Sequence, residues 1–165
     1  MKSLIISVFS LLLFTFNLQA KESCASSEYQ QFDFWLGQWQ VTNPENNQVS
    51  ESKITKILGG CVILEEYKTP SGYEGKSLNI YDKQQQRWHQ SWTDNSGLLL
   101  QLNGEFIDNA MVLTGVIVDS KGTKLLQKIT WSKLENNKVR QHWQQSNNAG
   151  VSWKTLFDGT YTAKK

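Results

Sequence analysis

Hydrophobic and polar residues alternate in short runs along this chain, and turn-forming residues separate the runs. Alternation over about four to eight residues, bounded by Gly, Pro, Asn, Asp and Ser, is typical of half-buried β-strands. Only residues 26–31, with a serine at the cap position, predict a short N-terminal helix. The predicted strands cover residues 38–42, 50–58, 62–69, 76–81, 87–93, 98–103, 105–107, 111–118, 124–132, 138–145, 151–157 and 161–163.

These segments amount to about ten strands, and the short loops between them place sequential strands side by side. An open meander of this length would leave two unpaired edge strands and one apolar face exposed to water. Closing the sheet into a barrel removes both problems. The pattern therefore predicts an all-β protein, an antiparallel up-and-down β-barrel or a clam.

One strand pattern occurs twice. The stretch W-H-Q-S-W at residues 88–92 is echoed by V-R-Q-H-W at residues 139–143, and each copy runs into a polar turn ending in glycine. Because side chains of a strand alternate between its two faces, the first, third and fifth residues of each copy share one face. That face holds the large apolar residues together with Gln90 and Gln141, so we expect it to point into the barrel. Both histidines then point outward.

Gln90 and Gln141 are thus amides placed between large aromatic residues on the inner face. An unpaired buried amide costs about 1–3 kcal/mol, so each must form hydrogen bonds. One interpretation is bonding to neighbouring side chains or to a trapped water. The other is that both amides orient a ligand inside a cavity with tryptophan walls.

One of two adjacent acids, Glu65 and Glu66, must also face inward, and we expect this to be Glu66. An inward carboxyl group needs a basic partner near the barrel mouth, or it has a raised pKa and a functional role. The candidate ligand-binding residues are therefore Trp39, Glu66, Trp88, Gln90, Trp92, Gln141 and Trp143.

The first residues of the chain resemble a secretory signal peptide. Lys2 supplies a positive start, residues 4–16 form an apolar run, and Ala20 is a small residue at the expected cleavage point. The run is shorter than the roughly 20 apolar residues of a membrane span, although an uncleaved anchor is the alternative. We expect a signal peptide over residues 1–20 and a single exported domain, periplasmic or secreted, over residues 21–165.

Charge content bears on nucleic-acid binding, and cysteine content bears on disulfides and metal sites. The chain has 17 Lys and Arg against 15 Asp and Glu without a basic cluster, which excludes nucleic acid as a partner. Cys24 and Cys61 predict a disulfide that closes a loop of roughly 37 residues and is worth about 3–4 kcal/mol, with two free buried thiols as the alternative. Two cysteines and two distant histidines lack zinc spacing, so neither a metal nor a cofactor is expected.

The string F-D-F-W-x-G-x-W at residues 32–39 resembles the opening of lipocalin and related calycin barrels, in which such a tryptophan closes one end. The chain is similar to exported lipocalin-like proteins of bacteria through this string, Gly60-Cys61, residues 77–82, the W-x-Q-x-W stretch and F-D-G-x-Y at residues 157–161. The resemblance implies a lipocalin-like fold and supplies no catalytic residues.

Motifs that carry enzymatic chemistry, such as G-x-S-x-G, H-E-x-x-H or a phosphate-binding glycine loop, do not occur in the sequence. We therefore expect an exported protein that binds a small, partly apolar molecule inside the barrel. The alternatives are a carbohydrate- or protein-binding module that uses surface aromatics, and a hydrolase that uses an inward acid. The surface aromatics for the first alternative would come from Trp35, Tyr67, Tyr73 and Tyr81.

Overall fold

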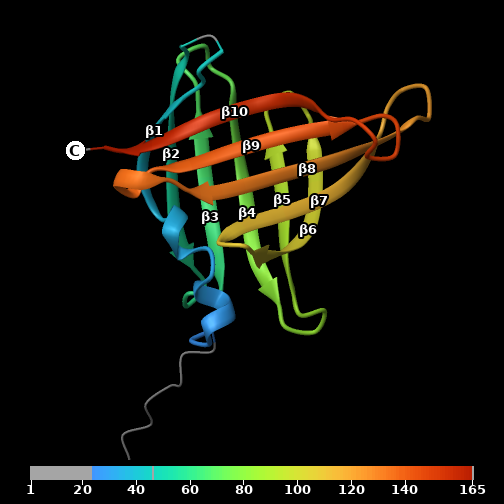
Figure 1. The fold of residues 1–165 in the computed structure, drawn as a ribbon. Coiled ribbons are helices and arrows are strands. Elements are labelled where there is room, and N and C mark those ends of the chain that lie inside the picture. Colours follow the sequence, from blue (N-terminus) through green and yellow to red (C-terminus); the bar gives the residue numbers. More distant parts are fainter. Residues whose placement is uncertain (1–23, 46, 165) are drawn as a thin grey trace, which may run out of the picture.

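The computed structural model describes residues 24–45 and 47–164. Its strands are β1 (Gly37–Thr42), β2 (Val49–Ile57), β3 (Val62–Lys68), β4 (Glu74–Asp82), β5 (Arg87–Asp94), β6 (Leu99–Ile107), β7 (Ala110–Val118), β8 (Lys124–Lys133), β9 (Val139–Ser146) and β10 (Lys154–Ala163). Within the described residues these ten strands form one closed antiparallel barrel, in which every strand pairs with its neighbours in sequence and β1 pairs with β10 (Figure 1). This confirms the predicted all-β up-and-down barrel.

Two predicted interruptions of strands are wrong. β6 runs without a break through Gly104, and β10 runs through Gly159, where the sequence pattern predicts the end of one strand and the start of another. A Cβ atom at Gly104 would lie 1.9 Å from the Val112 carbonyl oxygen, and one at Gly159 would lie 2.5 Å from the Phe157 ring. Both glycines therefore allow close approach of neighbouring groups inside the sheet and do not form turns.

The N-terminal segment closes one end of the barrel. It forms two 3₁₀ turns, η1 (Ser27–Gln30) and η2 (Asp33–Trp35), which lie at the lower left of the barrel in Figure 1. Phe32 and Trp35 are fully buried there and stack with ring centroids 4.8 Å apart. The Phe32 ring also meets the rings of Trp88 and Trp131 edge-on, so the plug is continuous with the aromatic core.

Two links attach this plug to the β2–β3 hairpin. Cys24 and Cys61 form the predicted disulfide, with their Cα atoms 5.0 Å apart. Lys56 Nζ lies 2.7 Å from Asp33 Oδ1, which joins η2 to the end of β2. A third 3₁₀ turn, η3 (Glu135–Asn137), connects β8 to β9.

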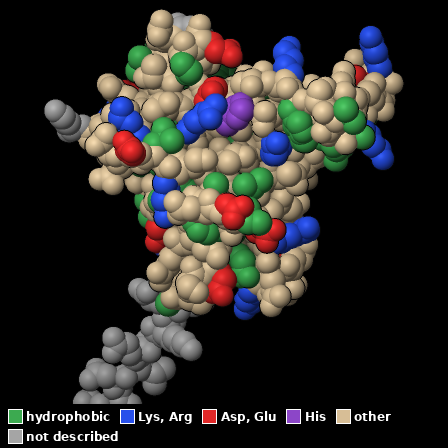
Figure 2. Space-filling model, viewed as in Figure 1, with side chains coloured by type: hydrophobic (Ala, Val, Ile, Leu, Met, Phe, Trp, Pro, Cys, Tyr) green, Lys and Arg blue, Asp and Glu red, His purple; other side chains and the backbone are tan. Residues whose placement is uncertain are grey.

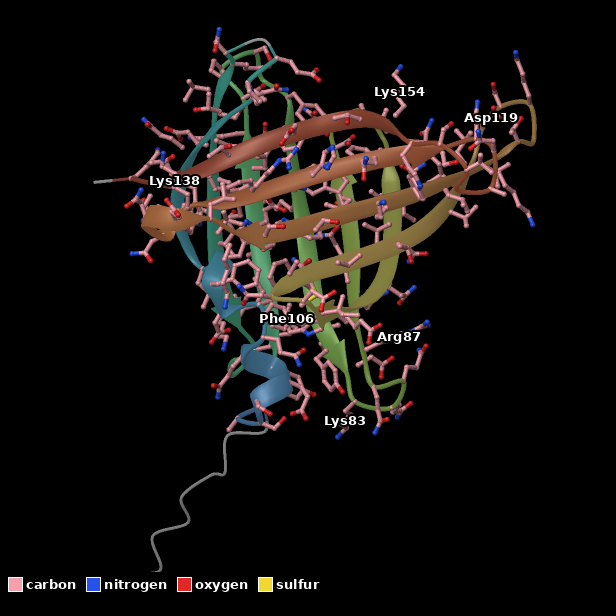
Figure 3. All side chains as sticks on the ribbon, in the orientation of Figure 1. Lys83, Arg87, Phe106, Asp119, Lys138 and Lys154 are labelled. Atoms are coloured by element: carbon pink, nitrogen blue, oxygen red, sulfur yellow. A yellow bond between two sulfur atoms is a disulfide. The ribbon has the colours of Figure 1, made fainter. Side chains whose placement is uncertain are left out.

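The hydrophobic core extends into the plugged half of the barrel. Phe106 lies at the plugged end, where its ring centroid is 6.0 Å from that of Phe34, whereas Asp119 lies far from the plug, in the loop after β7 (Figure 3). The plugged half holds a solid apolar core. Its fully buried members include Trp35, Trp88, Leu102, Met111, Leu113 and Trp131.

The predicted signal peptide, residues 1–20, lies outside the described residues. Among the residues that the structure describes, no helix has the length and apolar character needed to cross a membrane. On the face seen in Figure 2, acidic and basic side chains are interspersed rather than gathered by sign.

Candidate functional site

A cavity of about 170 Å³ lies inside the barrel, at the end away from the plug. Its walls come from β3, β5, β6, β8, β9 and β10, together with Tyr73 from the loop before β4. Most of the lining is aromatic, from Tyr67, Tyr73, Trp92, Trp143, Phe157 and Tyr161. The aliphatic contribution comes from Leu100, Ile129 and Leu156, and the polar contribution comes from Glu65, Gln90 and Gln141.

Glu65 is a buried acid at the wall of this cavity, with only 2% of its surface exposed. Ser52 Oγ on β2 donates to its Oε1 at 3.1 Å, and Ser77 Oγ on β4 donates to its Oε2 at 3.0 Å. Tyr161 on β10 places its hydroxyl 3.4 Å from Oε1. Three neutral hydroxyl groups therefore surround the carboxyl group. Both serines donate to it, whereas Tyr161 has a single hydrogen, which Gln141 Oε1 also accepts.

Burial raises the pKa of Glu65 from its ordinary value of 4.5 to about 7, and the three hydroxyl groups only partly oppose this shift. Burial and the neighbouring Glu65 also raise the pKa of Tyr161 well above its ordinary value, so this phenol stays neutral. The cavity lining contains no Lys, Arg or His residue among the described residues. Ionised Glu65 therefore lacks a counter-charge in the cavity.

Each of the two inner-face glutamines uses only one of its two amide atoms in a hydrogen bond. Gln90 Nε2 donates to Asn79 Oδ1 at 2.8 Å, and the Tyr161 hydroxyl donates to Gln141 Oε1. Gln90 Oε1 and Gln141 Nε2 have no hydrogen-bond partner among the described residues. Since both residues line the cavity, one acceptor and one donor are free for an occupant.

The two tryptophans of the cavity are held by their indole N–H groups. Trp143 Nε1 donates to Gln127 Oε1 at 2.8 Å, and the fully buried Gln127 is itself bonded to Gln145. Trp92 Nε1 donates to Asp94 Oδ2 at 3.2 Å, and the same carboxylate oxygen accepts from the Tyr73 hydroxyl at 2.8 Å. Because both N–H groups are engaged, these residues offer the cavity aromatic carbon surface.

Four of the seven predicted ligand-binding residues lie together at this cavity, namely Gln90, Trp92, Gln141 and Trp143. The other two tryptophans lie in the plugged half. Trp39 Nε1 donates to the Trp35 carbonyl oxygen at 2.9 Å, and Trp88 Nε1 donates to Gln31 Oε1 at 3.0 Å. Their N–H groups therefore anchor the N-terminal plug to the barrel.

The expectation that Glu66 points inward is wrong. Glu66 lies on the outer face, where its carboxylate meets Lys76 Nζ at 2.9 Å and Lys53 Nζ at 4.0 Å. These lysines are its direct partners on the two flanking strands, so both neighbours favour the outward placement. The inward acid is Glu65, with Tyr67 on the same face of β3.

Several cavity residues are not among the predicted ligand-binding residues. Tyr67 shares its strand face with Glu65, so choosing the other alternation of β3 would have found both. Phe157 and Tyr161 lie within the F-D-G-x-Y motif, and only barrel closure brings them beside β3. Tyr73 precedes β4, and no strand alternation predicts its place.

The histidines point outward as expected. His89 Nδ1 lies 2.9 Å from Asn103 Oδ1, and His142 Nε2 lies 2.9 Å from Thr155 Oγ1, both on the outer face. Figure 2 shows one of the two histidines at the molecular surface. Among the described residues no group of three or more His, Cys, Asp or Glu side chains is arranged to hold a metal ion.

A larger hollow of about 530 Å³ lies elsewhere on the surface, lined mainly by side chains of β2, β3 and β4. Several of its charges are paired: Glu51 meets Lys68 at 3.1 Å, and Glu66 meets the lysines described above. Charged side chains of both signs therefore line this hollow, whereas the inner cavity has a mostly aromatic lining.

Comparison with protein families and with curated proteins finds no match for this chain. The closed antiparallel barrel is consistent with a lipocalin-like fold.

Proposed function

We propose that this protein binds a small, partly apolar molecule in the cavity at the open end of its barrel. The observation that carries the proposal is the pairing of aromatic walls with two unpaired amide groups, Gln90 Oε1 and Gln141 Nε2. Ligand sites are mostly apolar concavities with a few polar groups that fix orientation, and this cavity has both features.

The volume limits the size of the ligand. Pockets for drug-sized ligands hold about 300–1,000 Å³, whereas this cavity holds about 170 Å³. A molecule with a single ring, or a short chain of similar size, is the class that fits. Tyr67, Tyr73 and Phe157 also line a neighbouring recess of about 280 Å³ at the barrel mouth, into which a longer substituent would extend.

The alternative functions find less support. Trp35 is fully buried in the plug, Tyr67 and Tyr73 line the cavity, and Tyr81 packs against Tyr29 and Trp88, so these aromatics do not share an outer surface. For a hydrolase, the described cavity lining holds a single carboxyl group and no histidine. A general acid would therefore lack a second acid or a base to work with.

We also propose that the protein acts after export, in the periplasm or outside the cell. The Cys24–Cys61 disulfide supports this placement, because disulfides persist in oxidising compartments and are rare in the cytosol. Cell fractionation with mass measurement of the purified protein tests it. Recovery of residues 21–165 from the exported fraction supports the proposal, and a full-length cytosolic product with reduced cysteines contradicts it.

Binding is tested by nuclear magnetic resonance of the ¹⁵N-labelled protein, with the indole N–H signals assigned by single Trp→Phe variants. The probes are benzyl alcohol, benzylammonium and benzoate, which share one ring and differ in charge. We expect at least one probe to shift the signals of Trp92 and Trp143 in a saturable manner. Trp39 and Trp88 in the plugged half serve as internal references and should stay unchanged.

Ile129→Phe is the matched control, because it adds volume at a cavity wall where Ile129 is only 3% exposed. The filled variant should lose the probe-induced shifts while retaining the folded spectrum. Absence of saturable shifts with all three probes, or shifts that survive in Ile129→Phe, would contradict binding in this cavity.

A further inference from the structure

Among the described residues, the lining of the cavity carries only negative charge. Glu65 is its only acidic or basic side chain among the described residues, and the groups that touch its carboxyl oxygens are the neutral hydroxyls of Ser52, Ser77 and Tyr161. Both serines donate to the carboxyl group, whereas the Tyr161 hydroxyl donates its single hydrogen to Gln141 Oε1. When Glu65 is ionised, the described lining of the cavity therefore places no counter-ion beside it.

The remaining walls suit a positive charge as well. Trp92, Trp143, Tyr67 and Phe157 surround the same space, and the indole N–H groups of both tryptophans are bonded to protein groups. Aromatic faces carry negative electrostatic potential and attract cations, most strongly where water is excluded. Gln90 Oε1 adds a free acceptor. An anionic ligand would find one free donor, Gln141 Nε2, but ionised Glu65 would repel it.

We propose that the occupant of this cavity is a small organic cation, an ammonium group on an aromatic or short apolar body, with the Glu65 carboxylate as its counter-ion. This inference rests on the proposed binding function and specifies the class of ligand. A metal ion is a poorer occupant, because one carboxylate among hydroxyls and amides lacks the several charged ligands that divalent cations prefer.

Binding of such a cation is coupled to release of a proton. The titratable groups that face Glu65 are Tyr161 on β10 and Tyr67 on its own strand, both with a raised pKa, while β2 and β4 present only neutral serines. With a pKa of about 7, Glu65 is about half protonated at pH 7, and pairing with an ammonium group requires the ionised form. Binding of benzylammonium should therefore release protons from Glu65 at pH 7, whereas at pH 9 the carboxyl group is already ionised and has no proton to release.

The test is isothermal titration calorimetry of the full protein with benzylammonium, benzyl alcohol and benzoate. Each titration is run at pH 7 and pH 9, in pairs of buffers with different ionisation enthalpies. Glu65→Gln removes the charge at nearly constant volume. Glu66→Gln, the next residue on β3, removes an outer charge and leaves the cavity unchanged.

We expect benzylammonium to bind at least about tenfold more tightly than benzyl alcohol at pH 9. Glu65→Gln should lose this preference and the proton release, and Glu66→Gln should keep both. Equal affinity for benzylammonium and benzyl alcohol, or a preference for benzylammonium that survives in Glu65→Gln, overturns the cation inference and leaves the binding function intact. Failure of all three probes to bind overturns both. The preference of the wild-type protein for benzylammonium over benzyl alcohol tests the inference even if Glu65→Gln does not fold.

Discussion

The buried carboxyl group of Glu65 makes the stability of the empty barrel depend on pH in an unusual direction. Most native carboxyl groups have a lowered pKa, so raising the pH through their titration stabilises the fold. Burial instead raises the pKa of Glu65 to about 7. The folded state therefore holds a proton between pH 4.5 and pH 7 that the unfolded chain has lost, and stability falls as the pH rises through this interval.

The magnitude follows from the two pKa values. One pKa unit corresponds to about 1.4 kcal/mol, so a rise from 4.5 to about 7 amounts to about 3 kcal/mol. This contribution is fully present below pH 4.5, declines up to about pH 7 and is absent above it. Because the side chain is only 2% exposed, solvent screening removes little of the effect.

The assay is urea unfolding followed by circular dichroism at pH values from 4.5 to 8.5, for the wild-type protein and Glu65→Gln. Subtracting the two curves cancels every other titrating group, including His142, whose pKa is lowered mainly by burial. We expect the free energy of unfolding of the wild type, relative to the variant, to fall by about 3 kcal/mol across this range. Glu66→Gln is the outer-face control and should lack this trend.

The reasoning is refuted if the difference between wild type and Glu65→Gln stays constant from pH 4.5 to pH 8.5. A constant difference would mean that Glu65 titrates near its ordinary value, which requires water or a counter-charge at the carboxyl group. A rise of the difference with pH would mean that the three hydroxyl donors outweigh burial.

Three further predictions concern the framework around the cavity. Cys61→Ser should lower the free energy of unfolding by about 3–4 kcal/mol in urea titrations under oxidising conditions, and an unchanged midpoint would contradict this. Gly104→Ala should cost about 1–3 kcal/mol or more, because the new Cβ meets the Val112 carbonyl oxygen; wild-type thermal stability would refute the contact. Asp94→Ala removes the acceptor shared by Tyr73 and Trp92 and should cost about 1–3 kcal/mol, with a shift of the Trp92 indole signal; an unshifted signal would exclude that bond.

The fold follows closely from local pattern. Short alternating runs and short loops predict a meander, and the cost of open edges predicts its closure, as the pairing of β1 with β10 confirms. The disulfide followed from two cysteines in a chain with the features of an exported protein. Glycines were less informative, since Gly104 and Gly159 interrupt the pattern in sequence without interrupting the strands.

The candidate site was only partly predictable. On β3 both alternations are apolar near their start, and Val62 and Ile63 are both buried, so local pattern does not distinguish the inner face. Pairing with β2 and β4 decides it, by placing lysines on both sides of Glu66 and a serine beside Glu65. These partners are distant in sequence, and their register is a property of the closed sheet.

The sequence alone determined which side chains share a face: Trp88, Gln90 and Trp92 on β5, and Gln141 with Trp143 on β9, because a strand repeats every two residues. Only the tertiary structure decided how far along the barrel axis each side chain lies. The N-terminal plug fills one end and engages Trp88, which leaves Trp92 and Trp143 at the other end beside the cavity. That depth depends on the tilt and register of the closed strands, and no local repeat encodes it.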